Sequence, residues 1–358
     1  MNVSLAPADR SVAPHWRALA AEALGPSCHN LPDLVLPALA GERRAVLATV
    51  REDGALKLAF PLLPPRVWRP WFRGLETPVN YPAVPHLARE GAVPALTAFL
   101  DALPRPLLLG EVATEGPFWD ALMASSAQVA VLRRWQRAVV RPRGSFAAWY
   151  DANFDGKRRY SFRRKRAKLS ELGQVVIERQ ATGENLDGWL SAFFDLEAKG
   201  WKGHKGTALK FDARACGTLR EAMPGLAAAG KLRLWCMKLD DRPIAMMSMI
   251  VDGGKGDILK VAYDEDFARV SPGVLLLLAA TEDIFAEGLA LADCCAIPDH
   301  PMYDHVWRDR LGIADVMVAG PGVPSALFNG FAKAERLRRD LRGRLKKIYY
   351  RVAGITPS

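Results

Sequence analysis

The sequence has little of what marks membrane-spanning or disulfide-stabilised proteins. Its longest apolar run, Val274–Ala280, falls far below the roughly 20 residues that cross a bilayer. Its five cysteines among 358 residues show no CxxC or Cys/His spacing, which argues against a zinc site and against a disulfide framework. The first residues, Met1–Arg10, lack the apolar core of a signal peptide. We therefore expect a cytoplasmic protein.

Motifs for common cofactor and nucleophile chemistry are also missing. The six histidines are scattered, without the HxxxH spacing that places two imidazoles on one helix face. There is no Gly-Lys-Ser/Thr phosphate loop, no GxGxxG after a strand and no Gly-x-Ser-x-Gly elbow. Cys294 and Cys295 lie in a segment expected to be core, so a thiol nucleophile is a remote alternative. No bound metal is expected.

The net charge of +10 is concentrated in two segments. Residues 157–168 (KRRYSFRRKRAK) carry eight basic residues and no acid, and residues 333–351 carry nine basic residues against two acids. The rest of the chain is therefore mildly acidic. Such segments fit either a nucleic-acid contact or solvated helix faces, and no recognition motif or aromatic-interleaved strand favours the first.

The patterning predicts an α/β fold with two units in series. In the first unit, the Asp-Gly turn at 53–54 between two apolar runs predicts a β-hairpin. Residues 1–45 are expected to form short helices, and the Pro- and Trp-rich stretch 61–85 an irregular loop. The other expected elements are helices at 93–103 and 117–125 and strands at 106–110 and 129–140.

The second unit is better patterned. Ser145 is placed to cap a helix that starts at Phe146, and Gly173, Gly230 and Gly288 are placed to end later helices. The expected helices are 157–172, 186–199, 214–229 and 272–287, and the expected strands are 175–179, 232–239, 244–251, 257–263 and 290–296. The basic amphipathic helix at 325–350 could pack on the domain, lie on an anionic membrane or receive an acyl carrier protein.

The start of the helix at Pro272 is the segment most suggestive of chemistry. The Ser271 hydroxyl is placed to cap the first amides, Pro272 suits the first helical position, and Gly273 lets a ligand approach the backbone. Free amides and the helix dipole favour an anion there, and a pyrophosphate is the natural occupant. Arg269 could pair with a phosphate. An ordinary capped helix would explain the same residues.

A strand, an Arg-x-x-Pro-Gly loop and an apolar helix, in this order, resemble the acyl-CoA-binding core of the GNAT acetyltransferases. The amino-acid sequence of this region looks closer to one branch of that superfamily, the BioF/CelD-like acetyltransferases, which are linked to cellulose and other exopolysaccharide synthesis. The matching segments are 197–203 (EAKGWKG), 206–209 (GTAL), 260–265 (KVAYDE), 267–269 (FAR) and 271–273 (SPG). The resemblance covers about residues 145–310. Over residues 30–140 it is thinner and is similar to the degenerate first unit of Fem-type tandem folds.

The resemblance implies tandem GNAT-like folds with mixed central sheets flanked by helices. A degenerate unit would occupy residues 1–144, the catalytic domain 145–320, and the basic C-terminal helix 321–358. The implied donor is acetyl-CoA, a longer acyl-CoA or an acyl carrier protein. The implied acceptor is an amine or hydroxyl on a small or saccharide-linked molecule. The residues implied to hold the donor are Val261, Ala262 and Tyr263 along the pantetheine arm, and Arg269, Ser271, Pro272, Gly273 and Val274 at the pyrophosphate.

Acyl transfer also needs a base for the acceptor and an acid for the leaving thiolate. Tyr303 follows the last expected strand, where GNAT enzymes often have a tyrosine that acts as general acid. The imidazole of His300 is suited to act as a general base at neutral pH. Packing against the following helix is the simpler alternative for this histidine. Relatives usually have lysine where Asp304 stands, which leaves the acceptor open.

Four further residues are candidates for substrate binding. Glu197 and Trp201 are expected on one helical face, and Glu197 could contact substrate or pair with Lys202. A tryptophan at such a position is more often core. Lys260 lies in the middle of the donor strand, so we expect it to meet a phosphate, a substrate carboxylate or Glu197.

Two other functions remain open. A Fem-like aminoacyl transferase would take charged tRNA as donor and would contact it through residues 157–168. A non-catalytic GNAT-like adaptor of a polysaccharide machinery would bind an acyl group or a partner without turnover.

Overall fold

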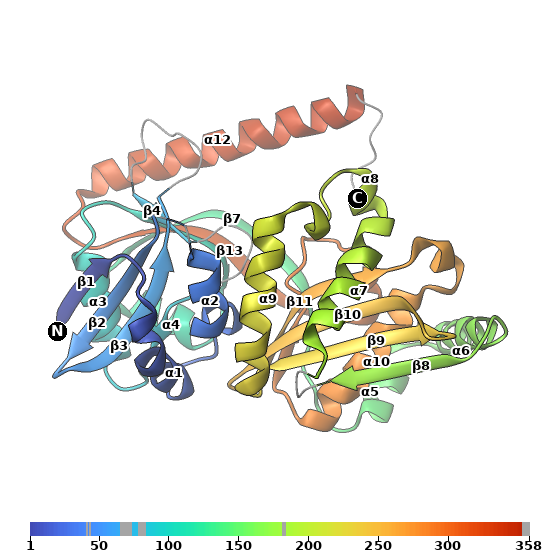
Figure 1. Ribbon diagram of the computed structural model, residues 1–358. Helices are drawn as coiled ribbons and strands as arrows, with labels where there is room; N and C mark the ends of the chain where they lie inside the picture. Colours follow the sequence, from blue (N-terminus) through green and yellow to red (C-terminus); the bar gives the residue numbers. More distant parts are fainter. Residues whose placement is uncertain (41, 43, 65–73, 78–83, 181–183, 353–358) are drawn as a thin grey trace.

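The computed structural model describes the chain except residues 41, 43, 65–73, 78–83, 181–183 and 353–358. Its strands form a four-stranded sheet, β1-β2-β3-β5, and a nine-stranded sheet, β4-β6-β13-β7-β12-β11-β10-β9-β8. Helices cover both sheets, and the long helix α12 (Ser325–Val352) crosses one edge of the molecule (Figure 1). The predicted mixed α/β fold class is confirmed.

The small sheet belongs to the N-terminal part of the chain. β2 (Val46–Glu52) and β3 (Ala55–Leu62) form the predicted hairpin, with Asp53 and Gly54 at the positive φ that a two-residue turn requires. β5 (His86–Leu87) pairs with β3. The prediction that residues 1–45 are only helical was wrong for β1 (Asn2–Ala6), which pairs with β2. The side chains of β1 are mostly exposed, so the strand is held by backbone pairing with β2. Such pairing leaves no apolar pattern in the sequence.

Helices in the N-terminal part lie near their predicted positions. They are α1 (Ala13–Ala21), α2 (Pro32–Leu39), α3 (Ala92–Asp101) and α4 (Pro117–Ala124). Within the predicted loop 61–85 the structure has the short strand β4 (Leu75–Glu76), while residues 65–73 and 78–83 lie outside the described residues.

The large sheet runs without interruption from the N-terminal to the C-terminal part of the chain. Its members besides β4 are β6 (Leu107–Ala113), β7 (Gln128–Val140), β8 (Val175–Gln180), β9 (Leu232–Leu239), β10 (Arg242–Asp252), β11 (Lys255–Tyr263), β12 (Leu291–Asp293) and β13 (Asp309–Ala319). β7 joins the two parts, because its end at Val139 and Val140 pairs with β12.

Strand β13 is the longest element that sequence patterning missed. The last strand was expected at 290–296, but β12 ends at Asp293 and the chain continues into β13, which inserts between β6 and β7. β13 is covered on both edges and most of its residues are buried, so it has no alternating polar face to reveal it. The two units therefore share one sheet, and the division of the chain at residues 144 and 320 stays a prediction.

Helices pack on both faces of β8–β11. α5 (Phe146–Asn153), α6 (Gly156–Ser170) and α10 (Pro272–Glu287) cover one face, and α7 (Leu186–Lys199) and α9 (Ala213–Ala228) cover the other. Ser145 caps α5 as predicted, since its Oγ accepts from the Ala148 amide at 3.2 Å. α8 (Trp201–His204) and α11 (Pro301–Val306) are short. This packing sets the start of α10 beside the end of β11.

Candidate functional site

β11 and β12 are parallel neighbours that separate. They pair only at Lys255–Leu291, Gly256–Ala292 and Asp257–Asp293. β11 then continues to Tyr263 while β12 stops, so in the described chain the backbone of residues 258–263 has no strand partner on that side. An edge of this kind leaves N–H and C=O groups available to an extended ligand.

α10 begins at Pro272 as predicted, but its capping differs from the prediction. Ser271 takes a left-handed conformation, φ 53° and ψ 58°, and its side chain makes no capping bond, so the predicted cap was wrong. Its hydroxyl instead accepts from Lys165 Nζ at 2.8 Å. The amides of Val274 and Leu275 both donate to the Ser271 carbonyl. Among the described residues at this terminus, only the Gly273 amide lacks a partner, so the expected cradle of several free amides is reduced to one.

Side chains lie close to the backbone at Gly273. A Cβ at this position would lie 3.0 Å from Tyr263 Cδ1 and 3.2 Å from Met302 Sδ. Arg269 is exposed just upstream, and Lys165 reaches the same terminus from α6. The start of α10 is therefore surrounded by cationic side chains, and the side chains of Tyr263 and Met302 lie close to the backbone of Gly273.

Tyr303 in α11 and His300, the residue just before this helix, lie close together. Their ring centroids are 4.9 Å apart, and Tyr303 also contacts Trp307 at 5.9 Å. Burial raises the pKa of Tyr303 well above 10, so its hydroxyl stays protonated at neutral pH. Burial, with the charge of Lys202, lowers the pKa of His300, so its imidazole is neutral.

The expected Glu197–Lys202 pair is present. Glu197 is buried, its Oε1 lies 2.6 Å from Lys202 Nζ, and its Oε2 accepts from the Leu209 amide at 2.7 Å. Burial lowers the pKa of Lys260, and Glu197 opposes that shift, so these two groups share one environment. Trp201 is 45% exposed, and Gly200 separates it from α7, so neither a core position nor a helical face shared with Glu197 is found.

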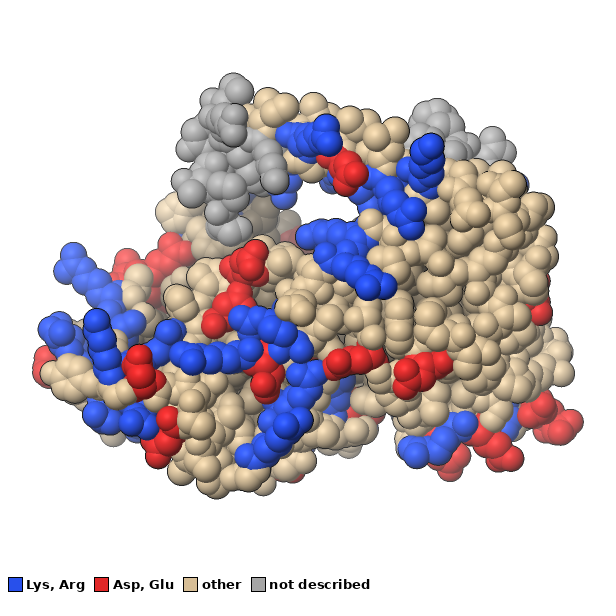
Figure 2. Space-filling model, turned by 180° about the vertical axis from the view of Figure 1, so that it is seen from behind, with Lys and Arg blue, Asp and Glu red and all other residues tan. Residues whose placement is uncertain are grey.

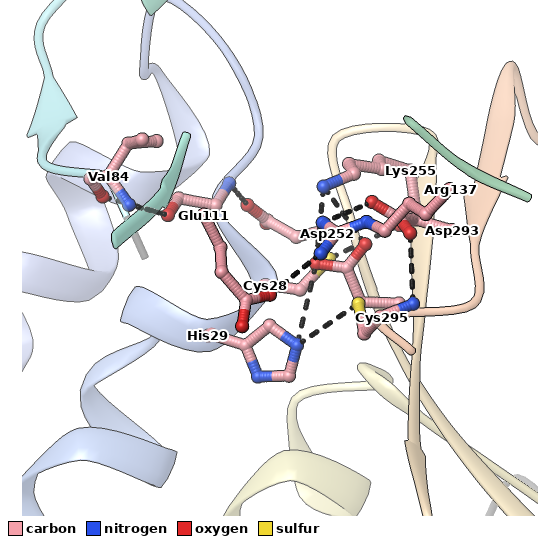
Figure 3. Close-up of polar contacts among 11 residues, drawn as sticks. Cys28, His29, Val84, Glu111, Arg137, Asp252, Lys255, Asp293 and Cys295 are labelled. Atoms are coloured by element: carbon pink, nitrogen blue, oxygen red, sulfur yellow. Dashed lines mark hydrogen bonds and ion pairs between the residues drawn. The ribbon is translucent and has the colours of Figure 1, made fainter. Parts of the chain in front are cut away.

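A buried polar cluster, the inter-unit cluster, lies where the closed ends of β11 and β12 meet the N-terminal part (Figure 3). Its members are Cys28, His29, Glu111, Arg137, Asp252, Lys255, Asp257, Asp293 and Cys295. Arg137 bridges the two parts, with Nη2 2.7 Å from Asp293 Oδ2 and Nη1 2.8 Å from Glu111 Oε2. Lys255 Nζ lies 2.9 Å from Asp257 Oδ1.

Three of these side chains offer atoms that metals bind. His29 Nε2 lies 3.6 Å from Cys295 Sγ and 3.7 Å from Asp257 Oδ2. Burial lowers the pKa of His29 to about 4, and burial raises the thiol pKa of Cys295 well above 9. The imidazole is therefore neutral and the sulfur protonated, while the Lys255 ammonium already balances Asp257. The arrangement suits a charge-balanced polar core better than a thiolate nucleophile.

Two cavities lie away from the predicted donor residues. One of about 200 Å³ opens beside the inter-unit cluster and is lined by Glu111, Arg137, Lys255, Asp257 and Asp293 among others. Another of about 440 Å³, the α6–α10 cavity, lies between α5, α6, α10 and strands β8 and β9.

Sequence reasoning missed the inter-unit cluster entirely. His29, Asp257 and Cys295 come from three distant segments, so no spacing rule could join them. The available signals were the acids Asp257 and Asp293, which lie in segments expected to be strands and which require partners when they are buried.

Comparison with known families identifies the part that carries the β11–α10 arrangement. Residues 156–300 match the family described as acetyltransferase (GNAT) domain. This part of the chain is therefore similar to a GNAT-type acetyltransferase domain. Its matched range includes β11, α10 and β12, whereas Tyr303 lies just beyond it. No curated protein matches the chain.

Solved structures resemble the chain over both units. The structure of FemX is 11% identical and aligns over 93% of this chain and 100% of its own, with a TM-score of 0.59. The structure of L-PGS from Bacillus licheniformis is 13% identical and aligns over 93% of this chain and 97% of its own, with a TM-score of 0.54. At such identities the likeness concerns the fold, and it extends over the whole tandem arrangement.

Among the described residues, no helix combines the length and the apolar character needed to cross a membrane.

Proposed function

We propose that the protein is an acyl-CoA-dependent N- or O-acyltransferase. One observation carries the proposal: β11 separates from β12 beyond Asp257, and the end of β11 lies beside the start of α10. The free edge at Val261, Ala262 and Tyr263 would pair with a pantetheine arm. The residues proposed to bind the pyrophosphate are Arg269, Lys165 and the turn formed by Ser271, Pro272, Gly273 and Val274.

The transfer would proceed by direct attack of the acceptor amine or hydroxyl on the thioester carbonyl. A backbone amide of β11 near Val261 would polarise the carbonyl oxygen, and neutral His300 would accept the proton of the nucleophile. Tyr303 would give its proton to the departing CoA sulfur. Glu197, Trp201, Lys202 and Lys260 are the proposed acceptor contacts. Donor binding would displace the flexible Met302 thioether from Gly273.

Calorimetric titration with CoA tests the donor. Arg269→Ala and Lys165→Ala should each weaken binding about tenfold, because each removes one charge-assisted contact worth about 1.5 kcal/mol. Arg89→Ala, an exposed arginine in the N-terminal part, is the matched control and should bind CoA as the wild type does. Absence of CoA binding by folded wild-type protein at millimolar concentration would refute the donor proposal.

A second candidate is a Fem-like transferase that takes an aminoacyl-tRNA donor. The likeness of the fold to FemX and the exposed arginines of α6 favour it. Replacing Arg163, Arg164 and Arg166 together by Ala would then weaken tRNA binding and reduce its salt dependence. Tight CoA binding together with salt-insensitive, weak tRNA binding would exclude this candidate.

The acceptor and cellular role are proposed on the sequence resemblance. It supports a BioF/CelD-like enzyme of exopolysaccharide synthesis, cytoplasmic, with a saccharide-linked acceptor and acetyl-CoA or an acyl carrier protein as donor. A non-catalytic adaptor is the alternative. It would retain partner binding after Tyr303→Phe and His300→Ala, and the wild type would show no turnover.

Contact of α12 with an anionic membrane is also proposed. Leu337, Leu341, Leu345 and Ile348 recur every three or four residues and are exposed. They lie on the side opposite to Phe328, Ala332 and Glu335, which are buried against the sheet. Basic residues border the exposed stripe, as in helices that lie in a lipid interface.

A further inference from the structure

The α6–α10 cavity is an open pocket that the proposed CoA-dependent transfer does not use. None of the residues proposed to bind CoA, to catalyse the transfer or to contact the acceptor lines it, although Arg163 and Arg166 are also the tRNA contacts of the second candidate function. Its volume of about 440 Å³ is within the range of small-molecule sites. Figure 2 views the face of the molecule that carries α5, α6 and α10, with Lys and Arg gathered where α6 lies.

The floor of this cavity is apolar. It is formed by Phe162 and Leu169 of α6, Leu275 and Leu278 of α10, and Ile177 and Met237 of the strands beneath. Apolar atoms that line an open cavity remain in contact with water, so covering them with an apolar ligand is favourable.

The rim of the cavity is cationic. Arg163 and Arg166 line it from α6, are exposed, and form no ion pair or hydrogen bond within the described chain. Other basic residues of the same helix are engaged: Arg158 donates to the His305 carbonyl and Arg159 pairs with Asp151. Arg179, also on the rim, pairs with Asp283 at 2.7 Å. Glu282 is the one acid among the lining residues.

We propose that the α6–α10 cavity binds an amphiphile with an anionic head group and an apolar body, such as a medium-chain carboxylate or alkyl phosphate. The guanidinium groups of Arg163 and Arg166 bind the head group through charge-assisted hydrogen bonds. The chain lies along the apolar floor between α6 and α10. A neutral amphiphile of the same length loses the head-group contacts, and a short anion loses the floor.

Titration of the full-length protein with dodecanoate, dodecyl phosphate and dodecanol tests this site, with the anions kept below their micelle concentrations and the alcohol below its solubility limit. We expect one anionic ligand per chain and at least tenfold weaker binding of the alcohol. A preference for dodecyl phosphate over dodecanoate assigns a phosphate head, and the reverse assigns a carboxylate. Equal affinity for the alcohol and both anions would overturn the proposal, and so would the absence of binding.

Variants locate the ligand. Arg163→Ala with Arg166→Ala should weaken anion binding at least tenfold, whereas Arg164→Ala should have no effect, because Arg164 is exposed on the same helix but does not line the cavity. Ala279→Trp adds a ring at the lining and should abolish binding while the circular dichroism spectrum stays native. Unchanged binding in the double variant, or an equal loss in Arg164→Ala, would place the ligand elsewhere. CoA titration of the same variants keeps the outcome separate from that of the donor proposal.

Discussion

Tyr303 of α11 and His300, the residue just before this helix, combine a protonated phenol and a neutral imidazole at one place. Both states have the same origin, because burial disfavours the charged form of each group. Glu197 forms an ion pair with Lys202, and the charge of Lys202 lowers the pKa of His300. The properties of these residues are therefore set by their neighbours as much as by their own chemistry.

The titration of His300 is the first prediction at this scale. Its folded-state pKa is lowered, so protonation favours unfolding, and stability falls as pH drops below about 6.5, the value of unperturbed histidine. NMR titration of the imidazole should give a midpoint below 6.5. Lys202→Met should raise this midpoint, because the lysine charge lowers it, whereas Lys205→Met should not. A wild-type midpoint at or above 6.5 would contradict the assignment.

The Arg137–Asp293 pair provides a stability prediction. Both side chains are buried, so Arg137→Met leaves a carboxylate without its partner and should lower the free energy of unfolding by about 3–5 kcal/mol. Chemical denaturation measures the loss. Adding Asp293→Leu should recover much of it, because the carboxylate that then remains without its arginine, Glu111, is 39% exposed and can be solvated. Lys210→Met breaks the exposed pair with Asp195 and should cost less than about 1 kcal/mol.

Among the elements, α12 has two unlike halves. Its first half is anchored: Phe328 and Ala332 pack on the sheet, Arg336 Nε donates to the Val131 carbonyl at 2.9 Å, and Arg339 pairs with Asp315. Leu341 and Leu345 in the second half are exposed, and Figure 2 shows open space between this helix and the body. An amphipathic helix held at one end presents its free apolar stripe to a partner or a surface.

Vesicle sedimentation tests the membrane contact of α12. The protein should bind phosphatidylglycerol vesicles more tightly than phosphatidylcholine vesicles, because the stripe is bordered by basic residues. Leu341→Glu with Leu345→Glu should weaken this binding at least tenfold, since two apolar side chains no longer enter the interface. Leu172→Glu changes an equally exposed leucine beside α6 and serves as control. Equal binding of both variants would mean that α12 does not contact the lipid.

At the scale of the whole molecule, β13 and β7 join the two units through one sheet. β13 follows the GNAT-type domain in sequence but completes the sheet beside β6, while β7 of the N-terminal part extends the sheet beside β12. The nine-stranded sheet therefore contains strands from both parts of the chain, whereas the four-stranded sheet is built from the N-terminal part alone. The ion pairs of the inter-unit cluster lie at the same boundary between the two units.

This arrangement predicts coupled unfolding. Val316→Ala removes buried methyl groups from β13 and should destabilise the protein by about 2 kcal/mol. In hydrogen exchange at increasing denaturant, peptides from β6 and β10 should lose protection together, and the variant should shift both by the same amount. If β10 keeps its wild-type protection while β6 is shifted, the units unfold separately.

The sequence by itself determined the local elements and the GNAT resemblance. Local features depend on residues that are close in the sequence, so the sequence predicts them. Examples are the hairpin at Asp53–Gly54, the Ser145 cap and the beginning of α10 at Pro272. The separation of β11 from β12, the loss of the Ser271 cap and the place of β13 depend on which surfaces meet, and only the tertiary structure decided them. The same holds for His29, Asp257 and Cys295, because folding alone brings side chains from three distant segments within reach of one another.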